Sequence, residues 1–129
     1  MSRAVGTINR KGELPAISRP VQGSITGSAT QHPLHEHPTP APVRIGLVRF
    51  EPGSRTHWHT HGGGQVLQVV EGAGLTQVEG GPVERIGEGD IITVGPGEKH
   101  WHGAGADGPM RHLAVTIGNV DWLEEASTS

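Results

Sequence analysis

From Val43 onward the chain consists of short runs in which apolar and polar residues alternate, separated by turns rich in glycine and proline. Val43, Ile45 and Leu47 show this alternation and share one face, which is typical of a β-strand. Further strands are predicted at residues 55–61, 66–70, 75–78, 83–86, 91–94, 99–102 and 112–117. Short strands with turn signals at this spacing predict an all-β fold, either a sandwich or a barrel.

The two ends of the chain lack this regularity. Residues 1–42 are rich in Ser, Thr, Pro and Gly, and we expect a short edge strand at residues 21–25, after which Pro33 and later prolines prevent regular pairing. Residues 121–126 are predicted to form a helical turn that packs Trp122 and Leu123 on the outside. The expected organisation is an N-terminal arm (1–42), one barrel domain (43–118) and a short C-terminal tail (119–129).

Composition restricts the function further. The 129 residues suit one domain with its own core, and because one Phe and no Tyr are present, that core must be aliphatic. A net charge of −3 offers no basic surface for nucleic acid, and the absence of Cys excludes disulfides and zinc–thiolate sites. No run approaches the roughly 20 apolar residues of a membrane helix, and residues 1–10 lack the apolar stretch of a signal peptide. We expect a cytoplasmic protein with neither nucleic acid nor membrane as a partner.

Histidine is the unusual component, with nine copies. His59 and His61 alternate on a predicted strand, so their side chains share a face and can hold one ion. Gln65 follows three glycines, which permit a tight turn that brings it back toward the histidines. His100 must reach the same site from another strand. These four side chains predict a metal site inside the barrel.

The ligand types indicate which ions and which chemistry suit the site. Imidazoles with an oxygen donor fit Mn²⁺, Fe²⁺, Co²⁺, Ni²⁺ or Zn²⁺. Gln65 is neutral, so the charge of the ion is not offset and the ion is a stronger Lewis acid than it would be beside a carboxylate. Four protein ligands on an octahedral ion leave two positions for substrate, which is typical of a catalytic site.

Other polar residues have more than one interpretation. His102 shares the face of His100 on a regular strand and is the candidate general acid or base, with lining of the barrel as the alternative. His57 either joins the face of His59 or lies at a frayed strand end. Arg49 and Arg55 either attract an anionic substrate or are solvated strand ends. Three interpretations apply to the segment that carries His32, His35 and His37. It is an accessory metal site, a flap over the barrel mouth or a solvated arm, and its composition favours the arm.

The motifs resemble those of the cupin superfamily. The first cupin motif matches Gly53, His59, His61, Gln65 and Gly72 at the expected spacing, with Gln65 in the position usually held by Glu. The second matches Gly89-Asp90 and the segment from Pro96 to His100, although Gly95 replaces the usual Pro and Ala104 the frequent Asn. The resemblance covers about residues 43–117. It implies a double-stranded β-helix (jelly-roll) barrel of six to eight strands with a metal in its interior.

Within that superfamily, the segments RTHWHTH, EGGPV, PGEKHWHGA and MRHLA are similar to small bacterial cupins that include the manganese-dependent hydroxynitrile lyases. The resemblance implies one divalent ion, Mn²⁺ ahead of Fe, Ni, Co or Zn, bound by His59, His61, Gln65 and His100. It also implies that His102 and His112 handle protons beside the ion. His57 and residues 1–42 depart from the pattern of these relatives.

The expected function is therefore a metal-dependent lyase of the hydroxynitrile lyase type, acting on a small molecule. A metal-dependent dioxygenase or isomerase with the same site is the first alternative, and a non-catalytic metabolite-binding cupin is the second. By the same resemblance we expect a homodimer or a higher homo-oligomer.

Overall fold

The computed structural model describes residues 19–21, 23–37 and 42–127, and every regular element in them is a β-strand. The strands are β1 (Arg19–Pro20), β2 (Ile25–Thr26), β3 (Ala29–His37), β4 (Val43–Phe50), β5 (Arg55–Thr56), β6 (His59–His61), β7 (Gln65–Val78), β8 (Glu84–Gly87), β9 (Ile91–Val94), β10 (His100–Ala104), β11 (Met110–Ile117) and β12 (Val120–Trp122). Nothing in the described ranges forms a helix long and apolar enough to cross a membrane.

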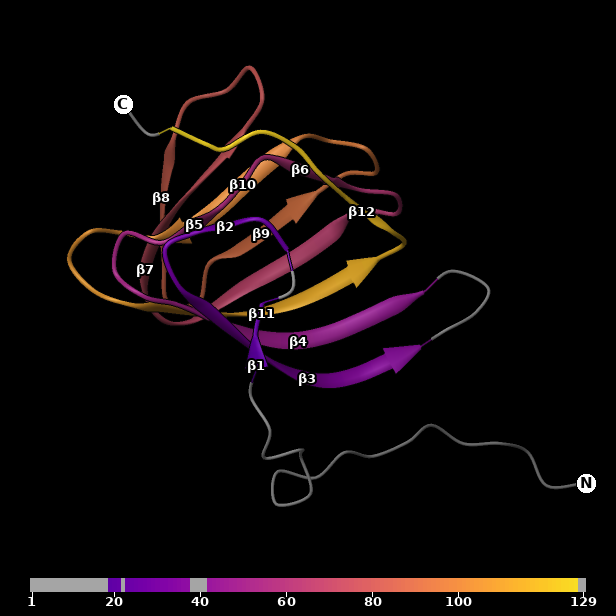
Figure 1. The fold of residues 1–129 in the computed structure, drawn as a ribbon, viewed down its shortest axis with the longest axis horizontal. Coiled ribbons are helices and arrows are strands. Elements are labelled where there is room, and N and C mark those ends of the chain that lie inside the picture. Colours follow the sequence, from indigo (N-terminus) through magenta and orange to yellow (C-terminus); the bar gives the residue numbers. More distant parts are fainter. Residues whose placement is uncertain (1–18, 22, 38–41, 128–129) are drawn as a thin grey trace, which may run out of the picture.

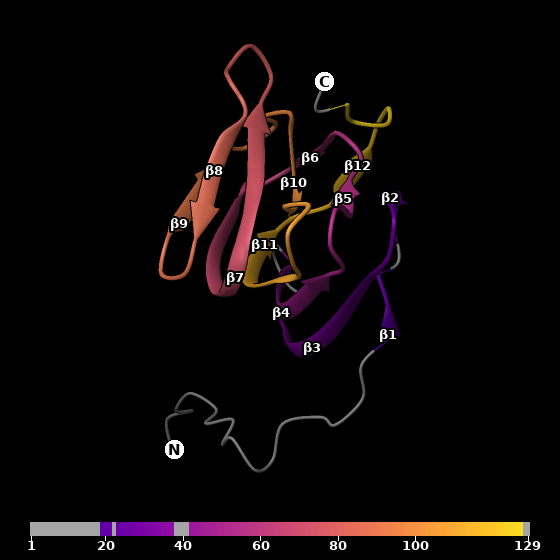
Figure 2. The same cartoon turned by 90° about the vertical axis from the view of Figure 1, so that its left-hand side faces the viewer.

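The strands form two antiparallel layers that face each other (Figures 1 and 2). One layer has the order β1-β3-β4-β11-β7-β9, and the other has the order β2-β5-β10-β7-β8. Strand β6 pairs with both β10 and β12. Because β7 belongs to both layers, it closes one side of a nearly complete barrel. The predicted all-β jelly-roll fold is confirmed.

Strand β7 corrects one prediction, since residues 66–70 and 75–78 belong to one strand of 14 residues. Gly72 has a φ of 81°, and a Cβ atom there would lie 2.2 Å from the carbonyl oxygen of Pro109. The register against β11 also shifts, so that Val70 is the extra residue of a bulge. A glycine and a bulge bend a strand without ending it, which lets β7 pass from one layer to the other.

Strand β3 corrects a second prediction, because Pro33 does not prevent pairing. Residues 29–37 pair with β4 along their length, with a shift in register between Pro33 and His35. The bulge and the edge position accommodate the missing N–H of proline, since β1 pairs with β3 only at Thr30 and Gln31. The predicted edge strand at 21–25 is reduced to β2, beside β5. The division of the chain into arm, barrel and tail stays a prediction.

The C-terminal segment corrects a third prediction, because β12 takes the place of the expected helical turn. Trp122 lies opposite His59 in the register of β12 and β6. Leu123 N–H donates to the carbonyl oxygen of Trp58 at 2.8 Å, so these backbone groups are used between strands and not within a helix. Trp122 is half-buried and faces the interior, whereas Leu123 is exposed, as expected.

The interior of the barrel is apolar at one end and polar at the other. Phe50 and Met110 are fully buried and pack with Val69 in a cluster that includes Ala29, Ile86 and Ala104. Along β11, the inward positions after Met110 are His112, Ala114 and Thr116, and along β4 those before Phe50 are Val48, Gly46 and Arg44. The polar end holds the candidate site.

Candidate metal centre

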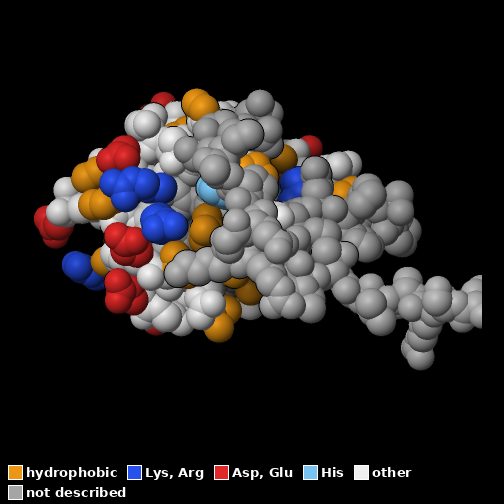
Figure 3. Space-filling model, turned by 90° about the horizontal axis from the view of Figure 1, so that it is seen from below, with side chains coloured by type: hydrophobic (Ala, Val, Ile, Leu, Met, Phe, Trp, Pro, Cys, Tyr) orange, Lys and Arg blue, Asp and Glu red, His pale blue; other side chains and the backbone are white. Residues whose placement is uncertain are grey.

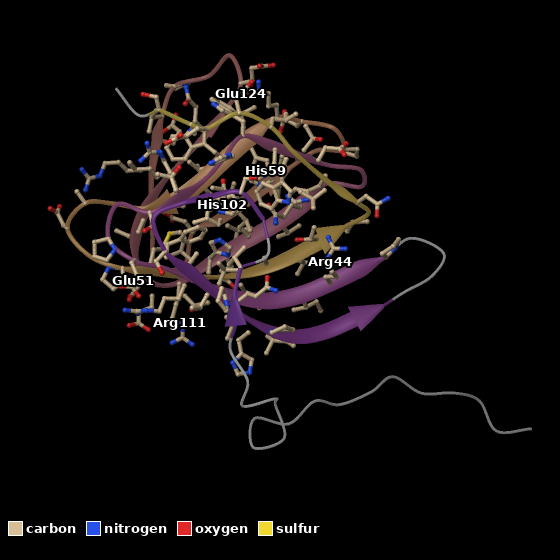
Figure 4. All side chains as sticks on the ribbon, viewed as in Figure 1. Arg44, Glu51, His59, His102, Arg111 and Glu124 are labelled. Carbon is tan, nitrogen blue, oxygen red and sulfur yellow. The ribbon has the colours of Figure 1, made fainter. Side chains whose placement is uncertain are left out.

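Three histidines from two strands meet inside the barrel. His59 and His61 lie on β6 and His100 lies on β10, where it is opposite His59 in the register. One ring nitrogen from each of the three lies within 4.8 Å of the others. All three side chains are buried, and Figure 4 shows His59 between the two layers. Histidines at this spacing are positioned to hold one metal ion.

The hydrogen bonds of the three rings agree with that role. His59 Nδ1 lies 2.8 Å from the carbonyl oxygen of His57, so Nδ1 donates and Nε2 remains for an ion. Neither ring nitrogen of His61 or His100 has a hydrogen-bond partner among the described residues. Buried polar atoms without partners are destabilising unless a ligand satisfies them. The orphaned nitrogens therefore fit a metal ion.

Gln65 supplies a fourth donor. Its Nε2 donates to Thr116 Oγ1 at 2.9 Å, and its Oε1 is buried without a described partner. The bond to Thr116 determines the orientation of the amide, so that an oxygen and not an NH₂ group is left for an ion. Gly64 has a φ of 91°, and a Cβ atom there would lie 2.6 Å from the carbonyl oxygen of Val94. Only glycine fits this turn, which returns the chain from His61 to Gln65.

Burial keeps these imidazoles neutral. It lowers the pKa of His59 and of His61 to about 4 and that of His100 to about 2. A neutral imidazole has a free lone pair, so the three rings can bind a cation at neutral pH without first losing a proton.

His102 and His112 form a second pair beside the three rings. His112 Nε2 lies 3.1 Å from His102 Nδ1, and both side chains are buried. Phe50 packs against both, with ring centroids 5.7 Å from His102 and 5.5 Å from His112. Burial lowers the pKa of His102 well below its ordinary value and that of His112 to about 4. His102 Nε2 has no described hydrogen-bond partner, which leaves it available to a substrate.

A cavity of about 740 Å³ opens onto this site. His59, His61, Gln65, His102 and His112 all line it. Its apolar wall combines segments from across the fold and includes Val21, Pro33, Leu34, Ile45, Val48, Phe50, Ala114, Val120 and Trp122. Trp122 also packs on His59, with ring centroids 4.6 Å apart. Part of the region predicted as an arm and part of that predicted as a tail therefore line the cavity.

Other residues singled out in the sequence lie elsewhere. His57 contributes its carbonyl group and does not line the cavity. His32 is opposite Leu47 on β4, on the outer face of the sheet, while the side chains of His35 and His37 lie outside the described part. The two arginines expected to attract an anion have other partners, because Arg49 pairs with Glu51 and Arg55 donates to the carbonyl oxygen of Ala126.

Among the cavity residues that sequence reasoning missed are Arg44 and Trp122. Arg44 could have been found from its position on the strand, because it lies an even number of residues before Phe50 and alternate residues on a strand share a face. Trp122 has no such signal, because its inward orientation depends on the pairing of β12 with β6.

Comparison with known proteins agrees with this fold. The model of the cupin domain matches residues 46–116. An (R)-mandelonitrile lyase of Granulicella tundricola is 48% identical over 106 residues, which cover 79% of this chain and 81% of that protein. A cupin-like protein from Thermotoga maritima has a TM-score of 0.77 and 34% identity, covering 88% of this chain and 91% of the other. The polyketide cyclase RemF from Streptomyces resistomycificus shares the fold, with a TM-score of 0.70 and 19% identity over 100% of this chain and 88% of its own.

Proposed function

The chain belongs to the cupin family, and we propose that it is a metal-dependent lyase that splits a cyanohydrin into a carbonyl compound and hydrogen cyanide. The observation that carries the proposal is the cluster of His59, His61, His100 and Gln65 with orphaned donor atoms, beside the buried pair His102–His112. The similarity to a protein named (R)-mandelonitrile lyase supports the same reaction.

We propose that His59, His61, His100 and Gln65 hold one divalent ion, Mn²⁺ in preference to Fe²⁺, Co²⁺, Ni²⁺ or Zn²⁺. Bound there, the ion supplies a Lewis acid that lowers the pKa of a substrate hydroxyl. None of these four donors is a carboxylate, so the donors do not offset the positive charge of the ion. Thr116 holds the amide of Gln65 in the orientation this arrangement needs.

His102 is the proposed acid and base. Its Nε2 accepts the proton of the substrate hydroxyl, the carbon–carbon bond to the nitrile breaks as the carbonyl forms, and the departing cyanide takes the proton back. For Nε2 to accept a proton, Nδ1 of His102 must carry the other one and donate it to His112 Nε2. His112 thereby sets the tautomer of His102 and stabilises the imidazolium that forms during the reaction.

The cavity wall is suited to the organic part of the substrate. Phe50, Val48 and Trp122 offer apolar surface next to His102 and His59. An aryl or alkyl group that packs there keeps water away from the carbon that reacts and points the hydroxyl toward the histidines.

Release of benzaldehyde from mandelonitrile tests the proposal. The protein loaded with Mn²⁺ is expected to release benzaldehyde faster than the metal-free protein and faster than buffer, while His102→Ala loaded with the same amount of metal is not. Equal rates for loaded and metal-free protein would exclude this reaction. Unchanged ligand affinity in His102→Ala, with no turnover by either protein, would instead favour a metabolite-binding cupin.

The donor set also favours a second candidate, an oxygenase or isomerase. Three imidazoles and a neutral amide suit Fe²⁺ as well as Mn²⁺. Oxygen uptake by the Fe²⁺-loaded protein with a diketone or an enediol distinguishes the oxygenase, because the lyase needs no oxygen. Enolisation of a carbonyl compound without oxygen uptake indicates the isomerase.

We also propose that two copies of the chain associate through the outer face of the β4–β11–β7–β9 layer. A band of apolar residues crosses this face, comprising Ile45, Leu47, Leu113, Val115, Val66 and Ile91. Val66 and Ile91 are 38% and 63% exposed. Figure 3 shows hydrophobic side chains exposed beside charged ones on the side of β3 and β4. Light scattering is expected to give the mass of a dimer for the wild type and a monomer for Ile91→Lys, with Val83→Lys as a control on another exposed valine.

A further inference from the structure

Arg44 is the cationic side chain that lines the cavity, and no acidic side chain is among the described lining residues. It lies on the inward face of β4, two positions before Gly46 and half-buried. Figure 4 shows it on the side of β4 that faces His59, whereas Arg111 and Glu51 lie at the outside of the barrel. The cavity therefore has a fixed positive charge in addition to any ion held by the histidines.

Among the described residues, the guanidinium of Arg44 leaves donors without a partner. Nη2 donates a hydrogen bond to the carbonyl oxygen of Gly118 at 3.3 Å, while a guanidinium has five N–H donors. Within the described residues, the ion pairs are formed by Arg49, Lys99 and Arg111, and none involves Arg44. A half-buried arginine without a carboxylate partner among the described side chains is suited to a bidentate bond with a carboxylate that enters the cavity.

The register of three strands connects Arg44 to the metal centre. Arg44 is opposite Thr116 on β11, and Thr116 is opposite Gln65 on β7. Thr116 Oγ1 accepts the hydrogen bond from Gln65 Nε2, so all three side chains lie on the same face. Two strand spacings of about 4.8 Å separate Arg44 from Gln65, which leaves about 10 Å between their Cβ atoms.

We propose that the substrate of this site carries a carboxylate, which Arg44 binds at one edge of the cavity while the reacting hydroxyl group lies at the histidines. The carboxylate and the hydroxyl group then lie at opposite ends of one small molecule, whose apolar part packs against the cavity wall. This inference rests on the proposed function for the reacting hydroxyl, but the carboxylate site itself depends only on Arg44.

Binding of matched acids and amides to the metal-loaded protein tests the proposal. The probes are para-(hydroxymethyl)benzoate with its neutral amide, and the shorter pair mandelate and mandelamide. Because hydrogen bonds to charged groups contribute about tenfold to a hundredfold in affinity, the wild type is expected to prefer para-(hydroxymethyl)benzoate over its amide by about tenfold or more in calorimetry. Arg44→Gln is expected to bind acid and amide equally.

Arg49→Gln is the matched control, since Arg49 lies on the same strand but on its outer face and pairs with Glu51. It is expected to keep the preference for the acid. Arg44→Met is a second variant in case Arg44→Gln disturbs folding, and thermal unfolding checks both. A preference that survives in both Arg44 variants would place the carboxylate on the ion and overturn the proposal.

Glu36 lies opposite Arg44 in the register of β3 and β4, and it provides one more decisive variant. No preference in the wild type, together with a preference in Glu36→Gln, would show that Arg44 is already neutralised within the chain and would overturn the proposal. Mandelonitrile cleavage by the wild type is measured separately. Its absence would overturn the proposed lyase while leaving the preference for the acid as it is, so the two failures are distinguishable.

Discussion

His112 Nε2 lies 3.1 Å from His102 Nδ1, and both rings are buried beside Phe50. Burial lowers the pKa of each histidine, so at neutral pH both rings are neutral and a single proton lies between them. The protonation of His102 Nε2 is therefore coupled to the tautomer of His112. This coupling makes the two rings one acid–base unit in the proposed reaction.

Replacement of His102 by Asn is expected to lower the rate of mandelonitrile cleavage by about a hundredfold or more, the usual contribution of a general base. His112→Asn is expected to lower it less, because the base remains and only its tautomer is disturbed. Metal content, measured by mass spectrometry of the loaded proteins, is expected to stay equal to the wild type. A His102→Asn variant that keeps the full rate would contradict the assignment of the base.

Thr116→Val is expected to weaken metal binding by about tenfold to a hundredfold, which is typical when a residue that orients a ligand is lost. Valine keeps the shape of threonine but cannot accept the hydrogen bond from Gln65 Nε2. The amide is then free to turn its NH₂ group toward the site. Competition with a fluorescent chelator measures the affinity. Thr93→Val, an exposed threonine on β9, is the control, and an equal loss in both variants would argue against the orienting role.

Replacement of single histidines distinguishes the metal ligands from a histidine that only lies beside them. His59→Ala, His61→Ala and His100→Ala are each expected to abolish the stabilisation of the wild type by Mn²⁺, which amounts to about 2.7 kcal/mol at a metal concentration of about 100 times Kd. His57→Ala is expected to retain it, because His57 contacts His59 through its carbonyl group. Thermal unfolding with Mn²⁺ and with EDTA measures the difference. Loss of stabilisation in His57→Ala would add that imidazole to the site.

The metal-free protein is expected to lose stability as the pH falls from about 6.5 to about 4. In the folded chain the pKa of His59 and of His112 is lowered to about 4, whereas in the unfolded chain a histidine titrates near about 6.5. Below the unfolded pKa the unfolded state binds the additional protons, so each histidine removes up to about 1.4 kcal/mol per pH unit from the free energy of unfolding. Each histidine stops lowering the free energy of unfolding once the pH is below the pKa of that histidine in the folded chain.

Urea unfolding in EDTA across this pH range tests the expectation. His112→Phe is the matched variant, because it removes one of the titrating groups and is expected to reduce the slope of stability against pH. A free energy of unfolding that stays constant between about pH 6.5 and about pH 4 would show that these rings are not held neutral by burial.

The fold and half of the site follow from patterns that are local in the sequence. His59 and His61 share a face because side chains alternate along a strand, and Gly64 permits the turn that returns Gln65 to them. The same alternation places His102 on the inward face together with His100. Three predictions are wrong where a glycine, a proline or a chain end indicates a break, at Gly72, Pro33 and residues 121–126. In each of these places pairing with a distant strand outweighs the local signal.

The all-β class, the histidine pattern of β6 and β10, and the neutral fourth donor could be predicted from the sequence, since each depends on residue identity and on spacing within one segment. Three contacts appear only in the folded chain: His112 meets His102, Thr116 orients Gln65, and Trp122 and Arg44 complete the cavity. These contacts depend on register between strands far apart in the chain. A shift of one residue would turn Arg44 outward and Ile45 inward, and residue order alone does not specify that choice.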